Sequence, residues 1–151
     1  MTVLSPDEVA ARASTTMHAA DSAAQFVGLQ VQEVRQGFAK LALTVRPEML
    51  NGHQICHGGY MFILADTALA HASNSYNQVA VAATASIEFL RPAHLDDTLT
   101  GIAEEQVLQG RNGIYDVRVT NQRDELIALF RGKTRLIRGK IVEQLEITTD
   151  S

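Results

Sequence analysis

An aspartate lies in the middle of a strongly apolar stretch of this sequence. The stretch is NGHQICHGGYMFILADTALAHASNS, residues 51–75, and Asp66 is its only acidic residue. Burying a carboxylate among apolar side chains costs free energy unless a partner compensates for it. A carboxylate in an apolar wall can, however, activate water or attack an electrophile directly. Asp66 is therefore the first candidate for a catalytic residue.

Two adjacent glycines, Gly58 and Gly59, stand where a helix is expected to begin. The first N–H groups of a helix have no partner within the helix, and that end of its dipole attracts negative charge. Without side chains, the two residues let a ligand approach closely. A carbonyl oxygen that gains negative charge would be stabilised there. Together with Asp66, the pattern indicates hydrolysis of an activated acyl group.

His57 lies nine positions before Asp66. On a helix this spacing corresponds to about 900° of rotation and roughly 13 Å of rise, so the two residues would lie on opposite faces. If the helix begins near Gly58, one chain places them poorly for a shared reaction. If both serve one site, we expect Asp66 to face His57 and Gly58 of a two-fold related chain.

Each feature also has a purely structural explanation. Asp66 could be a paired structural acid, His57 an ordinary hydrogen-bonded histidine, and HGG a tight turn. An Asn-Gly pair such as Asn51-Gly52 most often forms a tight turn. The combination is more informative than its members.

The HQICH segment places His53 and His57 four residues apart, with Cys56 between them, as in zinc metalloproteases. Gln54 stands where the general-base glutamate would be, and turn-like dipeptides bracket the segment, so we expect no metal. The sequence also lacks the G-x-S-x-G, G-x-G-x-x-G and P-loop patterns. Their absence argues against a serine hydrolase, a dinucleotide-dependent oxidoreductase and a kinase.

Composition indicates one soluble, cytoplasmic domain over residues 1–151, with 46% hydrophobic and 20% charged residues. The net charge of −4 provides no basic surface for nucleic acid or an anionic membrane. Cys56 is the only cysteine, so no internal disulfide can form. The N-terminus does not resemble a signal peptide, and the longest apolar run is too short to span a bilayer.

Capping residues and periodicity predict the elements that position the candidate residues. Ser5 and Pro6 begin an N-terminal helical segment, residues 1–27, with a break near Asp21 and an end at Gly28. Alternating apolar patterns predict strands over residues 29–37, 38–50, 79–92, 97–110, 113–122 and 125–140. Between them, a helix from Gly58 to about Ser75 is apolar almost all round and is therefore expected to be buried.

A run of strands without helical crossovers predicts an α+β fold, with an antiparallel sheet and the buried helix against one face. The open edges and second face of such a sheet predict dimerisation. The sequence resembles hotdog-fold acyl-CoA thioesterases, and more narrowly their PaaI (phenylacetic acid degradation) type. The resemblance rests on MLNGHQICHGGYMFILADTALAHASNS, IEFLRPAHLDDTL and GIYDVRVTNQ…ALFRGKTRLI. It implies about five or six strands wrapped around one long helix, and homodimers with shared active sites that often pair into tetramers.

The resemblance implies a role for each matching residue. Asp66 would be the general base or nucleophile, and the Gly58 N–H would polarise the thioester carbonyl. The residues that would orient the thioester or hold water are His57, Asn51 and Thr84, with Ser86 as a competitor for Thr84.

Coenzyme A carries phosphates, so a basic rim is expected despite the acidic total. By resemblance, the substrate-binding residues are Gly59, Arg91, Pro92, Gly110, Arg111, Asn112 and Lys133, with Arg135 and Arg138 as further candidates. Ordinary solvated charges at strand ends explain the basic residues equally well.

The predicted activity is hydrolysis of an aromatic acyl-CoA, phenylacetyl or hydroxyphenylacetyl, to the acid and free coenzyme A. No cofactor is expected, since the coenzyme A thioester is the substrate. One alternative is a hotdog dehydratase acting on enoyl or 3-hydroxyacyl thioesters, whose Asp/His pair has a different spacing. Another is a non-catalytic acyl-CoA-binding module, which would not need Asp66.

Overall fold

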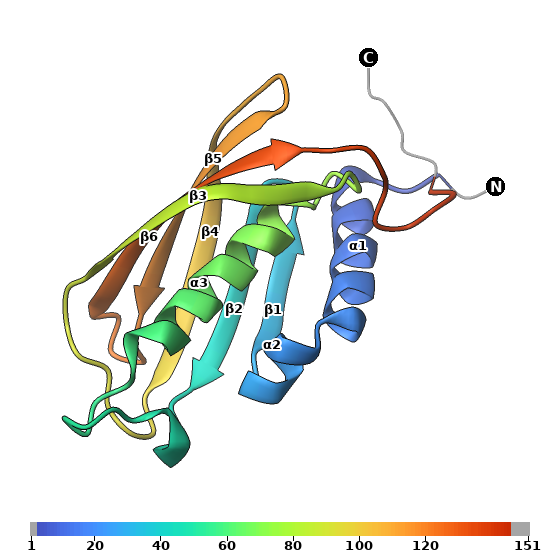
Figure 1. Ribbon diagram of the computed structural model, residues 1–151. Coiled ribbons are helices and arrows are strands. Elements are labelled where there is room, and N and C mark those ends of the chain that lie inside the picture. Colours follow the sequence, from blue (N-terminus) through green and yellow to red (C-terminus); the bar gives the residue numbers. More distant parts are fainter. Residues whose placement is uncertain (1–2, 146–151) are drawn as a thin grey trace.

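A computed structural model describes residues 3–145 as one sheet with three α-helices (Figure 1). The helices are α1 (Pro6–Ala20), α2 (Ser22–Val27) and α3 (Gly58–Ser73), with a 3₁₀ turn at Pro47–Met49. The strands are β1 (Gln30–Arg35), β2 (Phe38–Thr44), β3 (Ala80–Phe89), β4 (Thr98–Gln109), β5 (Asn112–Thr120) and β6 (Leu126–Leu136). They form an antiparallel sheet in the order β1-β2-β4-β5-β6-β3.

Helix α3 packs against one face of the sheet, and strands curve past it on both sides (Figure 1). Its inward residues are fully buried, as an almost wholly apolar helix requires; they include Leu64, Ala65, Ala68 and Leu69. Alternate residues of the strands face them, Val117 and Val119 of β5 among them. The sheet and the buried central helix predicted from the sequence are confirmed, and together they form the hotdog arrangement.

Two glycines in the sheet allow α3 to approach closely. A Cβ atom on Gly132 of β6 would lie 2.5 Å from Leu69 Cδ2, and one on Gly101 of β4 would lie 3.2 Å from Leu64 Cγ. The leucine side chains therefore occupy the space that side chains on these strands would need. This packing sets the height of α3 above the sheet.

The N-terminal helical segment is attached to α3 by a buried polar contact. Ser14 Oγ of α1 lies 2.7 Å from His71 Nδ1 of α3 in a hydrogen bond. Burial lowers the pKa of His71 to about 4, and His18, whose ring is 6.5 Å away, acts in the same direction. His71 is therefore neutral at physiological pH and serves as a structural partner of α1.

Within the described residues, the N-terminal helices begin and end at capping residues; positions 1 and 2 of the predicted segment lie outside those residues. Ser5 and Glu8 form a capping box at the start of α1. Asp21 separates the two helices, and its side chain accepts a hydrogen bond from the Ala24 N–H to cap α2. Gly28, in the left-handed conformation with φ of 87°, ends α2.

The predicted strand over residues 38–50 is too long. Strand β2 ends at Thr44, and Pro47 begins the 3₁₀ turn, because proline has no N–H to donate to a sheet. This turn is joined to α2 by Arg46, whose guanidinium donates to Val27 O at 2.6 Å and to Glu48 at 2.7 Å. Within residues 3–145, no helix has the length and apolar character needed to cross a membrane.

We expect Gly132→Ala to lower the free energy of unfolding by about 1–3 kcal/mol, because the added methyl group would collide with Leu69. Thermal and denaturant unfolding would measure the change. Gly52→Ala is the control, since no atom other than those of Gly52 and its two chain neighbours lies within 4 Å of its Cβ position. Equal stability of the two variants would contradict the close packing of α3.

Candidate active site

The start of α3 presents an unoccupied backbone donor. His57 caps the helix, and its Nδ1 accepts a hydrogen bond from the Gly59 N–H at 3.2 Å. Because Nδ1 is the acceptor, a neutral His57 carries its proton on Nε2. Among the described residues, the Gly58 N–H has no hydrogen-bond acceptor. This group, at the positive end of the helix dipole, can receive a carbonyl oxygen.

The loop before α3 is held by several backbone hydrogen bonds. His57 N–H donates to Met49 O at 2.8 Å, and Cys56 N–H donates to Ala93 O at 2.8 Å. The Asn51 side-chain oxygen accepts from His53 N–H at 2.9 Å and lies 3.4 Å from Ile55 N. Asn51 thus closes the turn with its carbonyl group, and its role toward a substrate remains a prediction.

The phenyl ring of Phe89 covers Gly58 from the end of β3. A Cβ atom at position 58 would lie 2.9 Å from Phe89 Cζ, closer than real Cβ contacts. Glycine is therefore favoured at this position both by the ring and by the need for an accessible N–H. No local pattern in the sequence indicated the contact, because Phe89 is 31 positions away.

Asp66 lies two turns further along α3 and is half-buried. It makes no hydrogen bond or ion pair with any described residue. Burial raises the pKa of its carboxyl group, and the nearby Asp21 carboxylate raises it further. An unpartnered carboxylate with a raised pKa has the properties of a general base or nucleophile. Sequence reasoning recognised Asp21 only as a helix break and missed its charge beside Asp66.

His57 and Asp66 do not meet within one protomer. Helix α3 begins at Gly58, as expected, so nine positions carry Asp66 to the opposite face and roughly 13 Å along the axis. A carbonyl group on the Gly58 N–H is therefore out of reach of the Asp66 of the same chain.

Thr84 and Ser86 lie on the outer face of the sheet, away from α3. Thr84 pairs with Lys133 and Ser86 with Arg131, whereas Ala85 between them pairs with Gly132, which faces the helix. The register of β3 shifts between Ala82 and Thr84, and a bulge of this kind reverses which face the following side chains occupy. One protomer therefore does not bring Thr84 beside Asp66.

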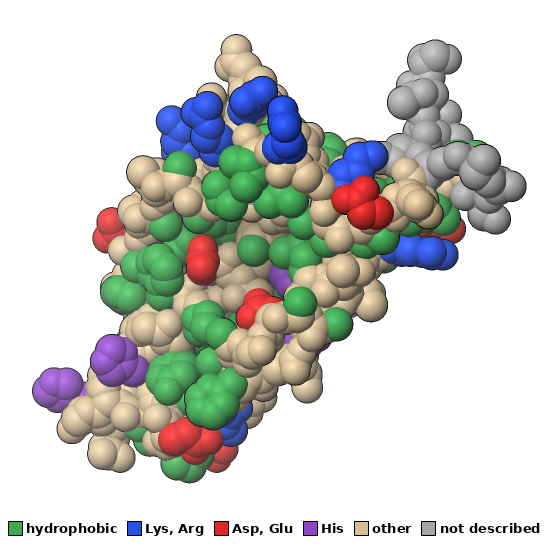
Figure 2. Space-filling view, turned by 45° about the vertical axis from the view of Figure 1, so that its right-hand side comes forward, with side chains coloured by type: hydrophobic (Ala, Val, Ile, Leu, Met, Phe, Trp, Pro, Cys, Tyr) green, Lys and Arg blue, Asp and Glu red, His purple; other side chains and the backbone are tan. Residues whose placement is uncertain are grey.

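The predicted coenzyme A contacts form two groups at opposite ends of β3. Arg91 and Pro92 follow the strand, near the start of β6, where Arg91 N–H approaches Ile127 O at 3.2 Å. The residues at the other end lie on the β4–β5 turn and the facing rows of β5 and β6; they are Gly110, Arg111, Asn112 and Arg135. Lys133 lies opposite Thr84, level with the middle of β3. Lys and Arg side chains gather there (Figure 2). Arg138 follows β6.

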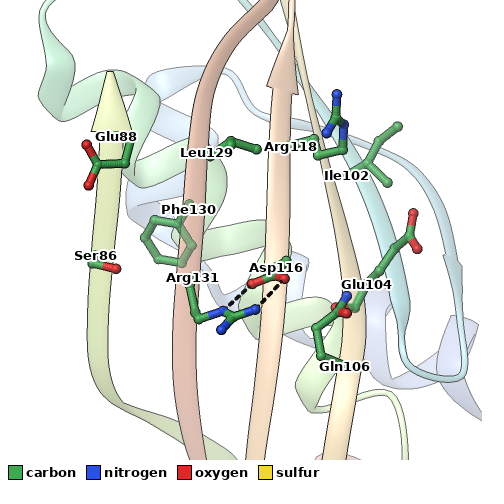
Figure 3. A pocket seen from close by; sticks show the side chains of 10 residues that line it. All are labelled: Ser86, Glu88, Ile102, Glu104, Gln106, Asp116, Arg118, Leu129, Phe130 and Arg131. Atoms are coloured by element: carbon green, nitrogen blue, oxygen red, sulfur yellow. Dashed lines mark hydrogen bonds and ion pairs between the residues drawn. The ribbon is translucent and has the colours of Figure 1, made fainter. Parts of the chain in front are cut away.

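A hollow of about 480 Å³ on the outer face of the sheet contains neither Asp66 nor Gly58 (Figure 3). A bidentate ion pair crosses it, with Arg131 Nε 2.6 Å from Asp116 Oδ1 and Arg131 Nη2 2.8 Å from Asp116 Oδ2. This hollow is therefore not the candidate reaction site, although its volume is large enough for part of a ligand. Its charges are mixed, and its central arginine is already paired.

The structure does not give HQICH the geometry of a zinc site. His53 lies in a turn and His57 is the N-cap of α3, so the two histidines do not share one face of a helix. Burial raises the pKa of the Cys56 thiol to about 11, so it stays protonated at neutral pH. In the described part of the chain, no three His, Cys, Asp or Glu side chains are grouped so that they could hold a metal ion.

The chain is similar in sequence and in structure to known thioesterases. Residues 53–128 match the family described as Thioesterase superfamily. The chain is 45% identical to acyl-coenzyme A thioesterase PaaI of Escherichia coli K12 over 125 residues, which cover 83% of this chain and 89% of that protein. The solved structure of the E. coli PaaI protein from the phenylacetic acid degradation operon matches with a TM-score of 0.87 and 42% identity. That match covers 89% of this chain and 97% of the other.

A more distant structure shows a ligand on the same fold. A Streptococcus mutans UA159 protein bound to acetyl CoA matches with a TM-score of 0.72 and 28% identity, covering 76% of this chain and 92% of that one. The resemblance inferred from the sequence motifs is confirmed by these comparisons.

We expect Asp21→Asn to lower the pKa of the Asp66 carboxyl group, because the substitution removes a neighbouring negative charge. Asparagine also caps helices well, so α2 should keep its start. An NMR titration of the Asp66 side-chain carboxyl carbon would measure the shift. An unchanged Asp66 titration in the variant would show that Asp21 does not act on this group.

Proposed function

The chain belongs to the thioesterase superfamily and is a PaaI-like acyl-CoA thioesterase; from this premise we propose that Asp66 and the Gly58 N–H carry out the hydrolysis. The observation that supports this assignment most strongly is the pair of unpartnered groups on α3, a backbone donor at its start and a carboxylate with a raised pKa further along. The 45% identity to an acyl-CoA thioesterase favours hydrolysis over the dehydratase and binding-module alternatives.

The proposed reaction uses these groups at successive steps. The thioester carbonyl oxygen accepts a hydrogen bond from the Gly58 N–H, which stabilises the negative charge that develops on it. Asp66 takes a proton from water as the water oxygen bonds to the carbonyl carbon. The C–S bond then breaks, and the thiolate takes up the proton. The products are the carboxylic acid and free coenzyme A. Direct attack by Asp66 is the other possible route, and it also requires the ionised carboxylate.

We propose that the working site lies between two protomers. Within residues 3–145, strand β3 pairs only with β6, and its residues from Val81 to Ser86 are all exposed. An exposed edge of this length is a template for pairing with another strand. Two-fold pairing of β3 with its copy would place the α3 helices side by side. This arrangement would let Asp66 of one protomer reach the thioester held at Gly58 of the other.

The same pairing would assemble a site for coenzyme A. In an antiparallel pair of β3 strands, the end of one strand lies beside the start of the other. Arg91 of one protomer would then approach Lys133 and Arg135 of its partner. These cations, separated within one chain, suit the phosphates of coenzyme A. His57 and Asn51 are proposed to orient the thioester and the water; Thr84, on the outer face of the sheet, lies away from both catalytic groups, so the role expected from the resemblance is not proposed for it.

The outer face of the sheet supports a second level of assembly. Its hollow combines Glu104, Asp116, Arg118 and Arg131 with the exposed Leu129. A surface with both charge signs and some apolar area is compatible with a copy of itself related by a two-fold axis. We propose a dimer of dimers on this basis.

The proposed substrate is an aromatic acyl-CoA of the phenylacetyl or hydroxyphenylacetyl kind. This class is supported by the likeness to the E. coli protein from the phenylacetic acid degradation operon. We propose a cytoplasmic enzyme, a compartment where a free thiol such as Cys56 stays reduced.

Asp66→Asn should reduce kcat for phenylacetyl-CoA by about 10²–10⁴-fold, because asparagine keeps the shape but cannot accept the proton. Thiol release would be followed with a chromogenic disulfide. Asp124→Asn is a matched control on an exposed turn and should stay within about twofold of wild type. If Asp66→Asn were as active as the control, the catalytic assignment would be wrong.

Mixing two inactive variants tests whether the site is shared. Asp66→Asn removes the carboxylate, and Gly58→Val obstructs the backbone N–H with a side chain that meets the Phe89 ring. If each site takes Asp66 from one protomer and Gly58 from the other, a hybrid dimer contains one intact site. Random mixing should then restore about one quarter of wild-type activity. No recovery, with hybrid dimers demonstrated by mass spectrometry, would place both residues of a site in the same protomer.

A further inference from the structure

Two partly exposed phenylalanines flank the start of α3. Phe89, at the end of β3, is 54% exposed although its ring lies against Gly58. Phe62, one turn after Gly58 on α3, is 37% exposed. Large apolar side chains that remain open beside a reactive group indicate a surface that another molecule covers.

A continuous apolar wall connects these two rings. The Phe62 ring packs edge-to-face on Phe130 of β6, with the centroids 5.2 Å apart. Phe130 is paired in register with Ile87, which lies two positions before Phe89 on the same face of β3. The wall therefore extends from Gly58 along α3, and Phe62 lies one turn from both Gly58 and Asp66.

We propose that Phe62 and Phe89 hold the aromatic ring of the acyl group and so determine which thioesters the enzyme prefers. This inference rests on the proposed function, since it takes the thioester carbonyl to lie on the Gly58 N–H. An arylacetyl group attached to that carbonyl begins beside the Phe89 ring and has the Phe62 ring within a turn of helix.

The chemistry of this wall selects an aromatic group over a short aliphatic one. Aromatic rings prefer edge-to-face or offset contacts with other rings, and such contacts add to the effect of burying apolar area. An acetyl group is too small to reach both side chains. The coenzyme A part of the substrate, polar and anionic, has its candidate partners among the basic residues at the ends of β3 instead.

Substrate discrimination tests the proposal. Phe89→Ala and Phe62→Ala should each lower kcat/KM for phenylacetyl-CoA by about tenfold or more, and change kcat/KM for acetyl-CoA by less than about threefold. Phe38→Ala is the matched control, because Phe38 is partly buried on the opposite face of the sheet, under Arg35. It should leave the ratio of the two substrates unchanged.

The contact between Phe89 and Gly58 gives a second, independent measurement. A methyl group at position 58 would push the Phe89 ring into the space assigned to the substrate ring. Gly58→Ala should therefore lower the phenylacetyl-to-acetyl ratio of kcat/KM. The double variant with Phe89→Ala should have the same ratio as Phe89→Ala alone, since no ring remains to be displaced. If the two substitutions changed the substrate ratio independently, so that their effects multiplied in the double variant, the proposed role of the Phe89 ring in specificity would be wrong.

Equal losses on both substrates, or no loss on phenylacetyl-CoA, would also overturn the proposal. Size-exclusion chromatography of each variant separates an effect on assembly from one on specificity. If wild type hydrolyses neither thioester, the proposed function fails, but the pocket can still be tested by calorimetry. A non-hydrolysable phenylethyl thioether of coenzyme A should then bind wild type and Phe38→Ala about tenfold more tightly than Phe62→Ala or Phe89→Ala.

Discussion

The close packing of α3 on the sheet is the constraint on which the rest of the structure depends. Leu64 and Leu69 lie directly over Gly101 and Gly132, so the distance between the helix and the strands is fixed. An apolar helix buried in this way leaves only a narrow part of its surface outside the core, where polar groups can meet a ligand. Asp66 and the Gly58 N–H both belong to that remaining part, at different turns of a rigid element. The precision of the candidate site therefore follows from the packing of the core.

The open edge of β3 follows from the same arrangement. The sheet curves past α3 and ends at β3, which has no neighbour on one side among the described strands. Strand edges of this kind favour pairing, and the helix spacing separates Gly58 from the Asp66 of its own chain. The proposed assembly of two chains would meet both conditions with one interface. The aromatic wall formed by Phe62, Phe130 and Phe89 extends to this edge, beside the proposed reaction centre.

The number, type and order of the elements could be predicted because they depend on local rules. Ser5, Gly28 and the apolar periodicity mark where helices and strands begin and end. Asp66 could be identified because a carboxylate in an apolar helix conflicts with its surroundings. Strand β2 was predicted too long, since alternation continues past Thr44 although Pro47 turns the chain. Asp21 was missed because nothing in its own segment indicates that it lies beside α3.

By itself, the sequence determined the helix that carries Asp66, the glycines at its start and the spacing that separates His57 from Asp66. Only the tertiary structure decided that Thr84 points away from α3, because a single bulge in β3 reverses the alternation. It also placed the Phe89 ring on Gly58. Arg91 lies beside Ile127 at the start of β6, whereas Lys133 lies further along that strand. The physical reason is the separation along the chain over which each kind of interaction acts. Caps and periodicity act over a few residues, whereas strand register and the contacts across a sheet depend on residues far apart in the chain.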